Sequence, residues 1–533
     1  MNTPVTRRDV IDAADRTQRQ ASDPMASVFV SASAGSGKTK LLIDRLLRLM
    51  LPLEVRTPDG EVILAEGSDP SRILCLTYTK AAAAEMANRL QSRLGSWVSL
   101  PDADLGAELL RLDVPNSEET RRRARGLFLR VLDLPGGLRI ETIHAFCQSL
   151  LSRFPLEASV DPHFTLMEDT DTTLALRGAM EHELGRAPEL AADVAGTVGI
   201  EDFFGRIKAL NMDGSRLEPM LRQWSMLPDG VVSAYRKAFQ AGQNTAEGIE
   251  ALLCNPPAEL AIRSGLQAAL GVVTPTAKPA VEAMLHWLGT HSDARDAKVW
   301  MSSLLTAAGT VRVMNRIINK KAQEAVPDIA GLLEEEGQRL LELQQTLRAT
   351  RLVTLNRALV ALSAPMLERF RSDKSARGLV DYNDLILETR NLLDEPGAAW
   401  VLYKLDGGID HLLLDEVQDT SGLQWQIAGM LTSEFFAGSG ARDEEARPRT
   451  VFAVGDFKQS IYGFQGADPE QFHFWRREFG TRVRNAGLEW RDPELNVSFR
   501  SVPPVLDVVD AVFSQPLAAH GLHEDGARGD FPR

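Results

Sequence analysis

Long hydrophobic runs are absent from this sequence. None of its 533 residues fall in an apolar stretch of about 18 or more, so no membrane-spanning helix is expected. The first ten residues, MNTPVTRRDV, have no apolar stretch behind their arginines, so no export signal is expected either. We therefore expect a cytoplasmic protein with no membrane partner.

Cysteines are also few, and basic residues are outnumbered by acidic ones. The three cysteines, Cys75, Cys147 and Cys254, are widely separated in apolar surroundings, so disulfides and a four-thiolate cluster are not expected. Acidic residues outnumber basic ones by 73 to 59, and the net charge is −14. This balance argues against attraction of nucleic acid by the whole surface. It does not exclude a locally basic channel, because binding depends on the phosphates that are contacted.

Short apolar runs alternate with helical patterns towards both ends of the chain. Buried strands are predicted at 28–31, 73–77, 409–414 and 450–454, and helices follow the first two of them. This alternation predicts an α/β fold with a parallel, doubly wound sheet, in which function lies at the carboxyl ends of the strands. A chain of this length is expected to form two to four domains.

The region from about 171 to 371 has a different pattern. It is rich in Leu, Ala, Glu and Arg at helical spacing, and residues 331–371 predict one long helix or a helix pair. No internal repeat is visible. We therefore expect a large all-α insertion whose two ends return to one sheet.

A loop of small residues between the first predicted strand and its helix is typical of a phosphate-binding loop. Small residues let backbone N–H groups approach phosphate oxygens, a lysine supplies positive charge and a hydroxyl binds Mg²⁺. The usual pattern starts with Gly, whereas Ala stands first here. The alternative is a flexible turn without a ligand. The residues concerned are Ala32, Ser33, Ala34, Gly35, Ser36, Gly37, Lys38 and Thr39.

Two carboxylates, Asp415 and Glu416, follow the predicted strand at 409–414. An acidic residue at the end of a buried strand can hold Mg²⁺ through water, and the adjacent carboxylate can orient or deprotonate the attacking water. Alone, such a pair is more often a solvated strand end. Together with the upstream loop, it predicts hydrolysis of a nucleoside triphosphate.

Further segments, in order along the chain, resemble the motifs of superfamily 1 DNA helicases, the group that contains UvrD, RecB and AddA. They are TYTKAAAAEM at 77–86, TIHAF at 142–146, DYNDL at 381–385, DEVQDT at 415–420, VGDFKQSIYGFQGA at 454–467 and LNVSFRS at 495–501. Gln18 stands where the family's adenine-reading glutamine precedes the phosphate loop. The resemblance implies a RecA-like domain of the P-loop type, with ATP and Mg²⁺ as cofactors.

The same resemblance implies roles for individual residues. The nucleotide would be bound by the loop 32–39 together with Gln18, Phe499 and Arg500, and the metal by Thr39 and Asp415. The residues of catalysis would be Lys38, Glu416, Gln459 and Arg500. The residues on the DNA side would be Tyr78, Thr79, His144 and Phe464. An arginine-rich stretch fits either a DNA groove or a solvated helix face; its members are Arg121, Arg122, Arg123, Arg125 and Arg130.

Departures from the usual motifs point to one branch of the superfamily. Lys80-Ala81 replaces Asn-Lys, Gln465 replaces an arginine and Ser498 replaces an asparagine. The Lys80-Ala81 and Gln465 forms look most like AddA, which belongs to the helicase-nucleases that repair double-strand breaks. The large insertion fits AddA or RecB better than a minimal UvrD-like enzyme. The resemblance implies 3′-to-5′ movement on single-stranded DNA, unwinding of duplex DNA and an AddB-like partner subunit.

The motif order implies four segments: 1–100 and 375–490 as two parts of one RecA-like motor domain, 101–374 as a mainly helical insertion with a DNA-contacting segment near 140–151, and 491–533 as the start of a second RecA-like domain. Later family motifs do not follow Ser501, so the sequence is expected to be truncated. Two alternatives stay open: a simpler UvrD-like repair helicase without a nuclease, and a half-motor that binds nucleotide and DNA without turnover.

Overall fold

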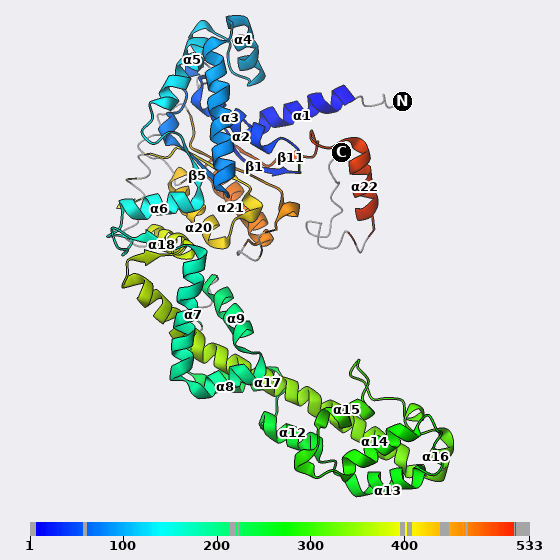
Figure 1. The fold of residues 1–533 in the computed structure, drawn as a ribbon. Helices are drawn as coiled ribbons and strands as arrows, with labels where there is room; N and C mark the ends of the chain where they lie inside the picture. The colour runs from blue at the N-terminus through cyan, green and yellow to red at the C-terminus, as the bar shows by residue number, and fades with distance from the viewer. Residues whose placement is uncertain are drawn as a thin grey trace. The chain divides into compact units, whose positions relative to one another are not determined.

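The computed structural model describes residues 7–56, 61–212, 220, 223–224, 226–394, 400–401, 404, 408–436, 447–461, 463, 467–515 and 518. The chain divides into two compact units. Unit 1 contains residues 1–169 and 374–533, and unit 2 contains residues 170–373. Figure 1 traces the chain from one end to the other.

Unit 1 is built on a parallel sheet with the strand order β10-β1-β9-β8-β4-β5, in which β11 also pairs with β1. All four strands predicted from the apolar runs are present. The strands are β1 (Ser27–Ala32), β4 (Ile73–Thr77), β5 (Arg139–Thr142), β8 (His411–Asp415), β9 (Thr450–Gly455), β10 (Trp490–Arg491) and β11 (Glu494–Leu495). Every pairing among them is parallel, which confirms the predicted α/β fold.

Helices cover both faces of this sheet, because its central strands are apolar on both sides. In β1, Val28 and Val30 pack into one core and Phe29 packs into the other. The first core includes α2 (Lys38–Met50), α3 (Lys80–Ser99), α4 (Asp102–Arg111) and α5 (Glu118–Leu132). The second includes α6 (Ile143–Arg153), α18 (Tyr382–Asp394), α20 (Gly422–Leu431) and α21 (Pro469–Asn485).

Smaller elements complete the described part of unit 1. Two further helices are α1 (Arg7–Ala21) and α22 (Pro503–Phe513). Two short ribbons pair β2 (Leu53–Arg56) with β3 (Val62–Ala65) and β6 (Thr165–Leu166) with β7 (Leu379–Val380). Single 3-10 turns are η1 (Pro70–Arg72), η4 (Val417–Asp419), η5 (Ser433–Phe435) and η6 (Phe457–Gln459).

The structural division differs from the expected segments in two places. Residues 101–169, which were expected in the insertion, lie in unit 1, because β5 pairs with β4 and α6 packs into the second core. At the other end, β10 and β11 pair with β1, so residues 490–495 extend the first sheet. These strands are short and partly charged, and they therefore give no apolar run in the sequence.

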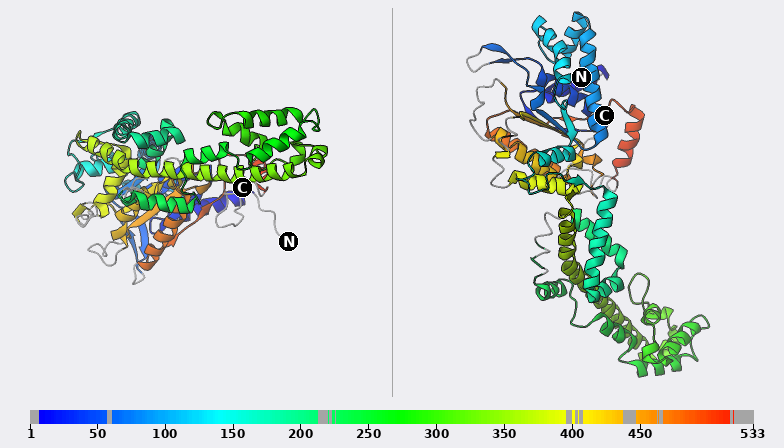
Figure 2. Two further views of the ribbon diagram at one scale, coloured as in Figure 1. Left: turned by 90° about the horizontal axis from the view of Figure 1, so that it is seen from below. Right: turned by 60° about the vertical axis from the view of Figure 1, so that its left-hand side comes forward.

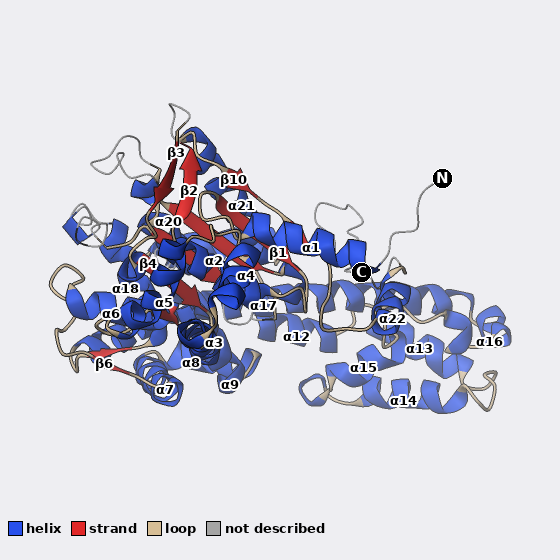
Figure 3. Ribbon diagram, turned by 90° about the horizontal axis from the view of Figure 1, so that it is seen from above, coloured by secondary structure: helices blue, strands red, loops and turns tan. Residues whose placement is uncertain are grey.

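Unit 2 is all-α, in agreement with the helical pattern of the sequence (Figure 3). Its spine is α17 (Pro327–Ser375), one continuous helix at the place where a long helix or a helix pair was predicted (Figure 2). The last two residues of this helix belong to unit 1. The earlier part of α17 packs against one helical group and residues 355–370 pack against another.

The other elements that the structure describes in unit 2 are α7 (Asp169–Arg186), α8 (Pro188–Thr197), α9 (Ile200–Met212), α11 (Pro228–Ala238), α12 (Ala246–Cys254), α13 (Glu259–Ala269), α14 (Lys278–Gly289), η2 (Ser292–Ala294), α15 (Ala297–Leu304), η3 (Met314–Arg316) and α16 (Lys320–Ala325). Across the residues that the structure describes in both units, no helix has the length and apolar character needed to cross a membrane.

Candidate nucleotide-binding site

The predicted phosphate loop connects the carboxyl end of β1 to the first turn of α2. Gly35 and Gly37 have φ angles of 76° and 91°, a region that glycine adopts without steric cost. A Cβ atom on Gly35 would lie 2.7 Å from Cβ of Arg500 and 2.8 Å from Oγ of Ser498, so the loop also needs glycine for space. Gly37 is the N-cap of α2 and has no side chain to occupy the N–H groups of the first turn. The loop therefore presents a helix N-terminus suited to an anion.

The ammonium group of Lys38 contacts the Glu416 carboxylate, with Nζ 2.7 Å from Oε2. The two residues are 378 positions apart in the sequence, and the sheet brings them to its carboxyl edge. Glu416 has a φ of 50°, which is uncommon for a residue other than glycine and costs about 1–3 kcal/mol. Nε2 of Gln418 also donates to Oε2 of Glu416 at 2.9 Å. A strained backbone and two polar contacts thus fix this carboxylate in front of the lysine.

Asp415 ends β8, next to Glu416. Burial raises its pKa to about 7, the charge of Glu416 adds to this, and the charge of Lys38 opposes it. Asp415 also lines a cavity of about 20 Å³ whose other polar walls include Thr77, Thr420 and Gln424. A cavity of this size has room for about one water molecule. This carboxyl group therefore titrates near neutral pH, unlike an exposed aspartate.

Gln459 is connected to Glu416 through two intervening residues. Its Nε2 donates to Oδ2 of Asp456 at 2.7 Å, and the backbone N–H of Asp456 donates to Oε1 of Gln418 at 2.9 Å. Gln418 in turn contacts Glu416. The ends of β8 and β9 are thus linked by hydrogen bonds. Sequence reasoning assigned no role to Gln418 or Asp456, although both lie inside the quoted motifs.

Gln18 is buried against the phosphate loop. Its Nε2 donates to the carbonyl of Ser36 at 2.9 Å, and its Oε1 accepts from Nζ of Lys40 at 3.0 Å. Lys40 also forms an ion pair with Asp44 at 2.9 Å. Lys40 was missed from the sequence. Its position directly after Thr39 in the first turn of α2 was the available signal.

Residues after β11 run beside the same loop. The backbone N–H of Phe499 donates to the carbonyl of Gly35 at 2.9 Å, while Phe499 as a whole is 52% exposed. Arg500 is exposed, and its Cβ faces Gly35. The N–H of Ser33 donates to the carbonyl of Leu495 at 3.1 Å. The structure therefore brings both motif residues to the loop, with their side chains accessible.

The residues present fit a nucleotide phosphate with a hard cation. Ser36 is 1% exposed, and its Oγ has no hydrogen-bond partner among the described residues, which leaves a buried hydroxyl for an incoming ligand. Thr39 and Asp415 offer the oxygen ligands that Mg²⁺ prefers. Of the remaining loop residues, Ala32 ends β1 and is buried, Ser33 is buried and Ala34 is exposed.

The residues predicted on the DNA side follow two neighbouring strands. Tyr78 and Thr79 come after β4, His144 comes after β5, and Thr77 pairs with Thr142 at the ends of these strands. Thr79 caps α3 by accepting from the N–H of Ala82, so its side chain has a local structural role. Phe464 lies outside the described residues.

His144 is packed rather than freely exposed. Its ring contacts Tyr382 edge-on, with 5.4 Å between centroids, and burial lowers its pKa. The arginines of α5 are also engaged locally. Arg123 contacts Glu119 at 2.7 Å, and Arg125 contacts Asp102 at 2.6 Å. These pairs favour the solvated helix face over a DNA groove for that stretch.

A phosphate loop at the carboxyl edge of a parallel sheet, with a paired lysine and glutamate and a neighbouring aspartate, defines a P-loop nucleotide hydrolase domain. Residues 14–480 match the model of the UvrD/REP helicase N-terminal domain. The chain belongs to the UvrD/REP helicase family, whose members are ATP-dependent helicases.

Curated relatives point to one branch of this family, the A subunits of ATP-dependent helicase/nucleases. The A subunit of the Clostridium novyi enzyme is 25% identical over 94% of this chain and 39% of its own length. Its namesake from Pelotomaculum thermopropionicum is 27% identical over 92% of this chain and 37% of its own length. This chain thus spans about two fifths of the length of these relatives.

Proposed function

We propose that this chain carries the ATP-hydrolysing part of an AddA-like DNA helicase that moves 3′ to 5′ on single-stranded DNA and acts in double-strand break repair. The observation that carries the proposal is the 2.7 Å contact between Lys38 and Glu416 at the carboxyl edge of the sheet. The motif resemblance and the names of the relatives support the finer assignment. An AddB-like protein would be its partner.

On the nucleotide side, Lys38 and the N–H groups at the start of α2 would bind the phosphates, and Thr39 and Asp415 would hold Mg²⁺. Bound Mg²⁺ would neutralise charge on the phosphate oxygens. The Lys38–Glu416 contact suggests how the site is made ready. In this contact each residue neutralises the charge of the other. Phosphates that compete for Lys38 would release Glu416 to orient and deprotonate the attacking water.

Other side chains would report on the bound nucleotide. Gln459 would contact the terminal phosphate, because its hydrogen bond to Asp456 connects it to the Glu416 network. Arg500 would reach the same phosphate from the segment beside Gly35, and Phe499 would stack on adenine, for which its ring is accessible. Gln18 would read the edge of the base from its place beside Ser36.

On the DNA side, Tyr78 and Phe464 would stack on bases, and Thr79 and His144 would contact the strand. Stacking on aromatic rings contributes about 1–3 kcal/mol per base and tolerates any sequence, which suits a motor that steps along DNA. Tyr78 follows β4, which neighbours the strand that ends in Asp415. A shift of the carboxyl end of β4 or β8 would therefore move residues of both the nucleotide site and the DNA side.

The test is phosphate release by the 533-residue chain with ATP and Mg²⁺, with and without single-stranded DNA. We expect Lys38→Ala to abolish DNA-stimulated release, and Glu416→Gln to keep nucleotide binding while abolishing turnover. Lys278→Ala, an exposed lysine of unit 2, is the matched control and should behave as the parent. Polarity is tested separately, by displacement of a bound protein from the 3′ or the 5′ end of an oligonucleotide.

The outcomes separate the candidate functions. DNA-stimulated turnover that depends on Lys38 supports the helicase motor. Binding of nucleotide and DNA without turnover identifies the half-motor. A folded chain that binds no nucleotide refutes the phosphate-loop assignment and the proposal with it.

A further inference from the structure

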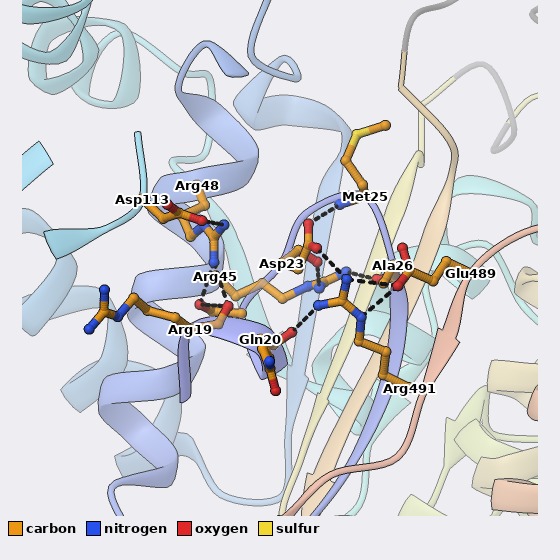
Figure 4. A network of polar contacts seen from close by, with 11 residues as sticks. Arg19, Gln20, Asp23, Met25, Ala26, Arg45, Arg48, Asp113, Glu489 and Arg491 are labelled. Atoms are coloured by element: carbon orange, nitrogen blue, oxygen red, sulfur yellow. Dashed lines mark hydrogen bonds and ion pairs between the residues drawn. The ribbon is translucent and has the colours of Figure 1, made fainter. Parts of the chain in front are cut away.

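Three arginine side chains gather around the carboxyl end of α1, the helix that carries Gln18 (Figure 4). Arg45 and Arg48 come from α2, and Arg491 comes from β10. Arg45 is 0% exposed and Arg48 is 3% exposed. Arginine is rarely buried so completely, because removing its charge from water is costly unless the guanidinium is well bonded.

The arginines donate mainly to backbone carbonyls at the end of α1 and just beyond it. Nη1 of Arg48 donates to the carbonyl of Arg19 at 2.6 Å, and Nη1 of Arg491 donates to the carbonyl of Gln20 at 2.9 Å. Arg45 donates to the carbonyls of Asp23 and Ala26, the latter at 2.8 Å. The last carbonyls of a helix have no partners within the helix, and positive charge near them is favourable.

Acidic residues balance part of this charge. Asp23 receives Arg491 at 2.8 Å, and Asp113 receives Arg48 at 3.2 Å. Burial nevertheless lowers the pKa of Arg45 to about 9. The Nε atoms of Arg45 and Arg48 are buried and have no hydrogen-bond partner in the described part of the chain. Burying these arginines therefore costs free energy, which apolar side chains of similar size would not cost.

Few side chains are buried in the part of α1 whose side chains the structure describes, Ile11 to Ala21. Among its side chains from Ile11 to Ala21, those that are buried are Ala14, Gln18 and Ala21. Two alanines bury little apolar surface, so apolar packing of these described residues stabilises the position of the helix weakly. The guanidinium contacts at its carboxyl end, together with the hydrogen bonds of Gln18, add to the stabilisation of this part of the helix.

Arg48 acts closest to Gln18. Besides the carbonyl of Arg19, it donates to Oγ of Ser22 at 2.9 Å. The backbone N–H of Ser22 donates to the carbonyl of Gln18, also at 2.9 Å. The Arg48 side chain thus binds Arg19, which directly follows Gln18, and Ser22, whose N–H closes the helical turn by bonding to the Gln18 carbonyl. A rotation of this turn would move the Gln18 amide away from Ser36.

We propose that Arg48, with Arg45 and Arg491, positions Gln18 by clamping the carboxyl end of α1, and that it thereby sets the base selectivity of nucleotide binding without contacting the nucleotide. This inference rests on the proposed role of Gln18 in reading the base. Arg48 is a positioning residue on this view. Its loss should change which base is preferred, a readout that general loss of stability does not alter.

The experiment is equilibrium binding of fluorescent ATP and UTP analogues to the 533-residue chain, in the parent, Gln18→Ala, Arg48→Met and the double variant. We expect Gln18→Ala to reduce the ATP-to-UTP affinity ratio by about tenfold, the worth of one or two hydrogen bonds. Arg48→Met should give a similar reduction. The double variant should show no further loss, because both changes disable one contact.

Two more variants complete the design. Arg19→Ala is the matched control: its side chain is exposed while its carbonyl is the acceptor of Arg48, so the parent ratio should be kept. Arg48→Lys keeps the charge but cannot bond two acceptors with a planar fork, and it replaces Arg48→Met if that variant fails to fold. A partial loss of selectivity is expected for it.

The outcomes distinguish the two levels of the proposal. A parent-like ratio in the Arg48 variants, while Gln18→Ala loses selectivity, overturns the clamp and leaves the role of Gln18 intact. Additive losses in the double variant also overturn it, because Arg48 would then act by another route. An unchanged ratio in Gln18→Ala removes the base-reading role, and the clamp inference fails with it.

Discussion

The titration of Asp415 predicts that Mg²⁺-dependent nucleotide binding weakens sharply just below neutral pH. Burial at the end of β8 raises the pKa of Asp415 to about 7, helped by Glu416 and opposed by Lys38. Only the ionised carboxylate can serve as a Mg²⁺ ligand. With this pKa, about nine-tenths of the carboxyl groups are ionised at about pH 8 and about one-tenth at about pH 6. Metal-dependent affinity should therefore fall about tenfold over this range.

The assay is titration of a fluorescent ATP analogue into the chain at both pH values, once with Mg²⁺ and once with a chelator. The ratio of the two affinities isolates the metal contribution, because titration of the phosphates affects both arms. Asp415→Asn should bind weakly with Mg²⁺ and lose the pH dependence of the ratio. A parent ratio that is the same at both pH values refutes the reasoning.

The same shift also affects the stability of the nucleotide-free protein. A carboxyl group with a raised pKa binds its proton more tightly in the folded state than in the unfolded state. Its contribution to stability is full below the ordinary value of 3.8 and is lost as pH rises to about 7. The total is about 4 kcal/mol, at 1.36 kcal/mol for each pH unit. Urea unfolding should therefore show a decline over this window that Asp415→Asn reduces.

Two further substitutions test the loop and the start of α18. Gly35→Ala should raise the nucleotide dissociation constant at least about tenfold, because the new methyl group would meet Arg500. Gly136→Ala is the control: Gly136 has a similar φ but open space around it, so this variant should bind nucleotide as the parent does. Lys374→Met should destabilise the fold by about 3–5 kcal/mol in urea unfolding. The buried ammonium group of Lys374 contacts the carboxylate of Asp381 at 2.6 Å and also that of Asp384, and the substitution leaves both carboxylates without this partner. The loss should shrink at acid pH, where the carboxylates can be protonated, and a loss that is independent of pH would contradict the assignment.

Apolar runs in the sequence predicted the central strands of the sheet. The strands β5, β10 and β11 were not predicted, for a physical reason. The strands β1, β4, β8 and β9 are buried on both faces, so each leaves a continuous apolar run. The edge strand β5 reads Arg-Ile-Glu-Thr, and β10 and β11 have two residues each. Such strands depend on pairing with a neighbour, which local sequence does not reveal.

The candidate nucleotide-binding site was likewise predicted from the sequence only in part. Motif spacing placed Lys38 and Glu416 at the carboxyl edge of one sheet, and the structure brings them into contact. The contacts of Gln18 with Lys40 and of Arg48 with α1 were not predicted, because they depend on how α1 is docked. Docking is decided by tertiary contacts between residues that no motif places together.

Backbone strain identifies the same site without any resemblance to a family. Four described residues other than glycine have a positive φ: Asp113, Ser159, Gln240 and Glu416. Asp113 and Gln240 each directly follow the C-cap residue of a helix, where a left-handed residue is a normal way to end it, and Ser159 lies in a turn after α6. Glu416 instead follows a strand, so helix termination does not account for its conformation. It is also the carboxylate that faces Lys38, beside the aspartate with the raised pKa. Strain that chain geometry does not require, at a point where charges converge, supports the catalytic role proposed for Glu416.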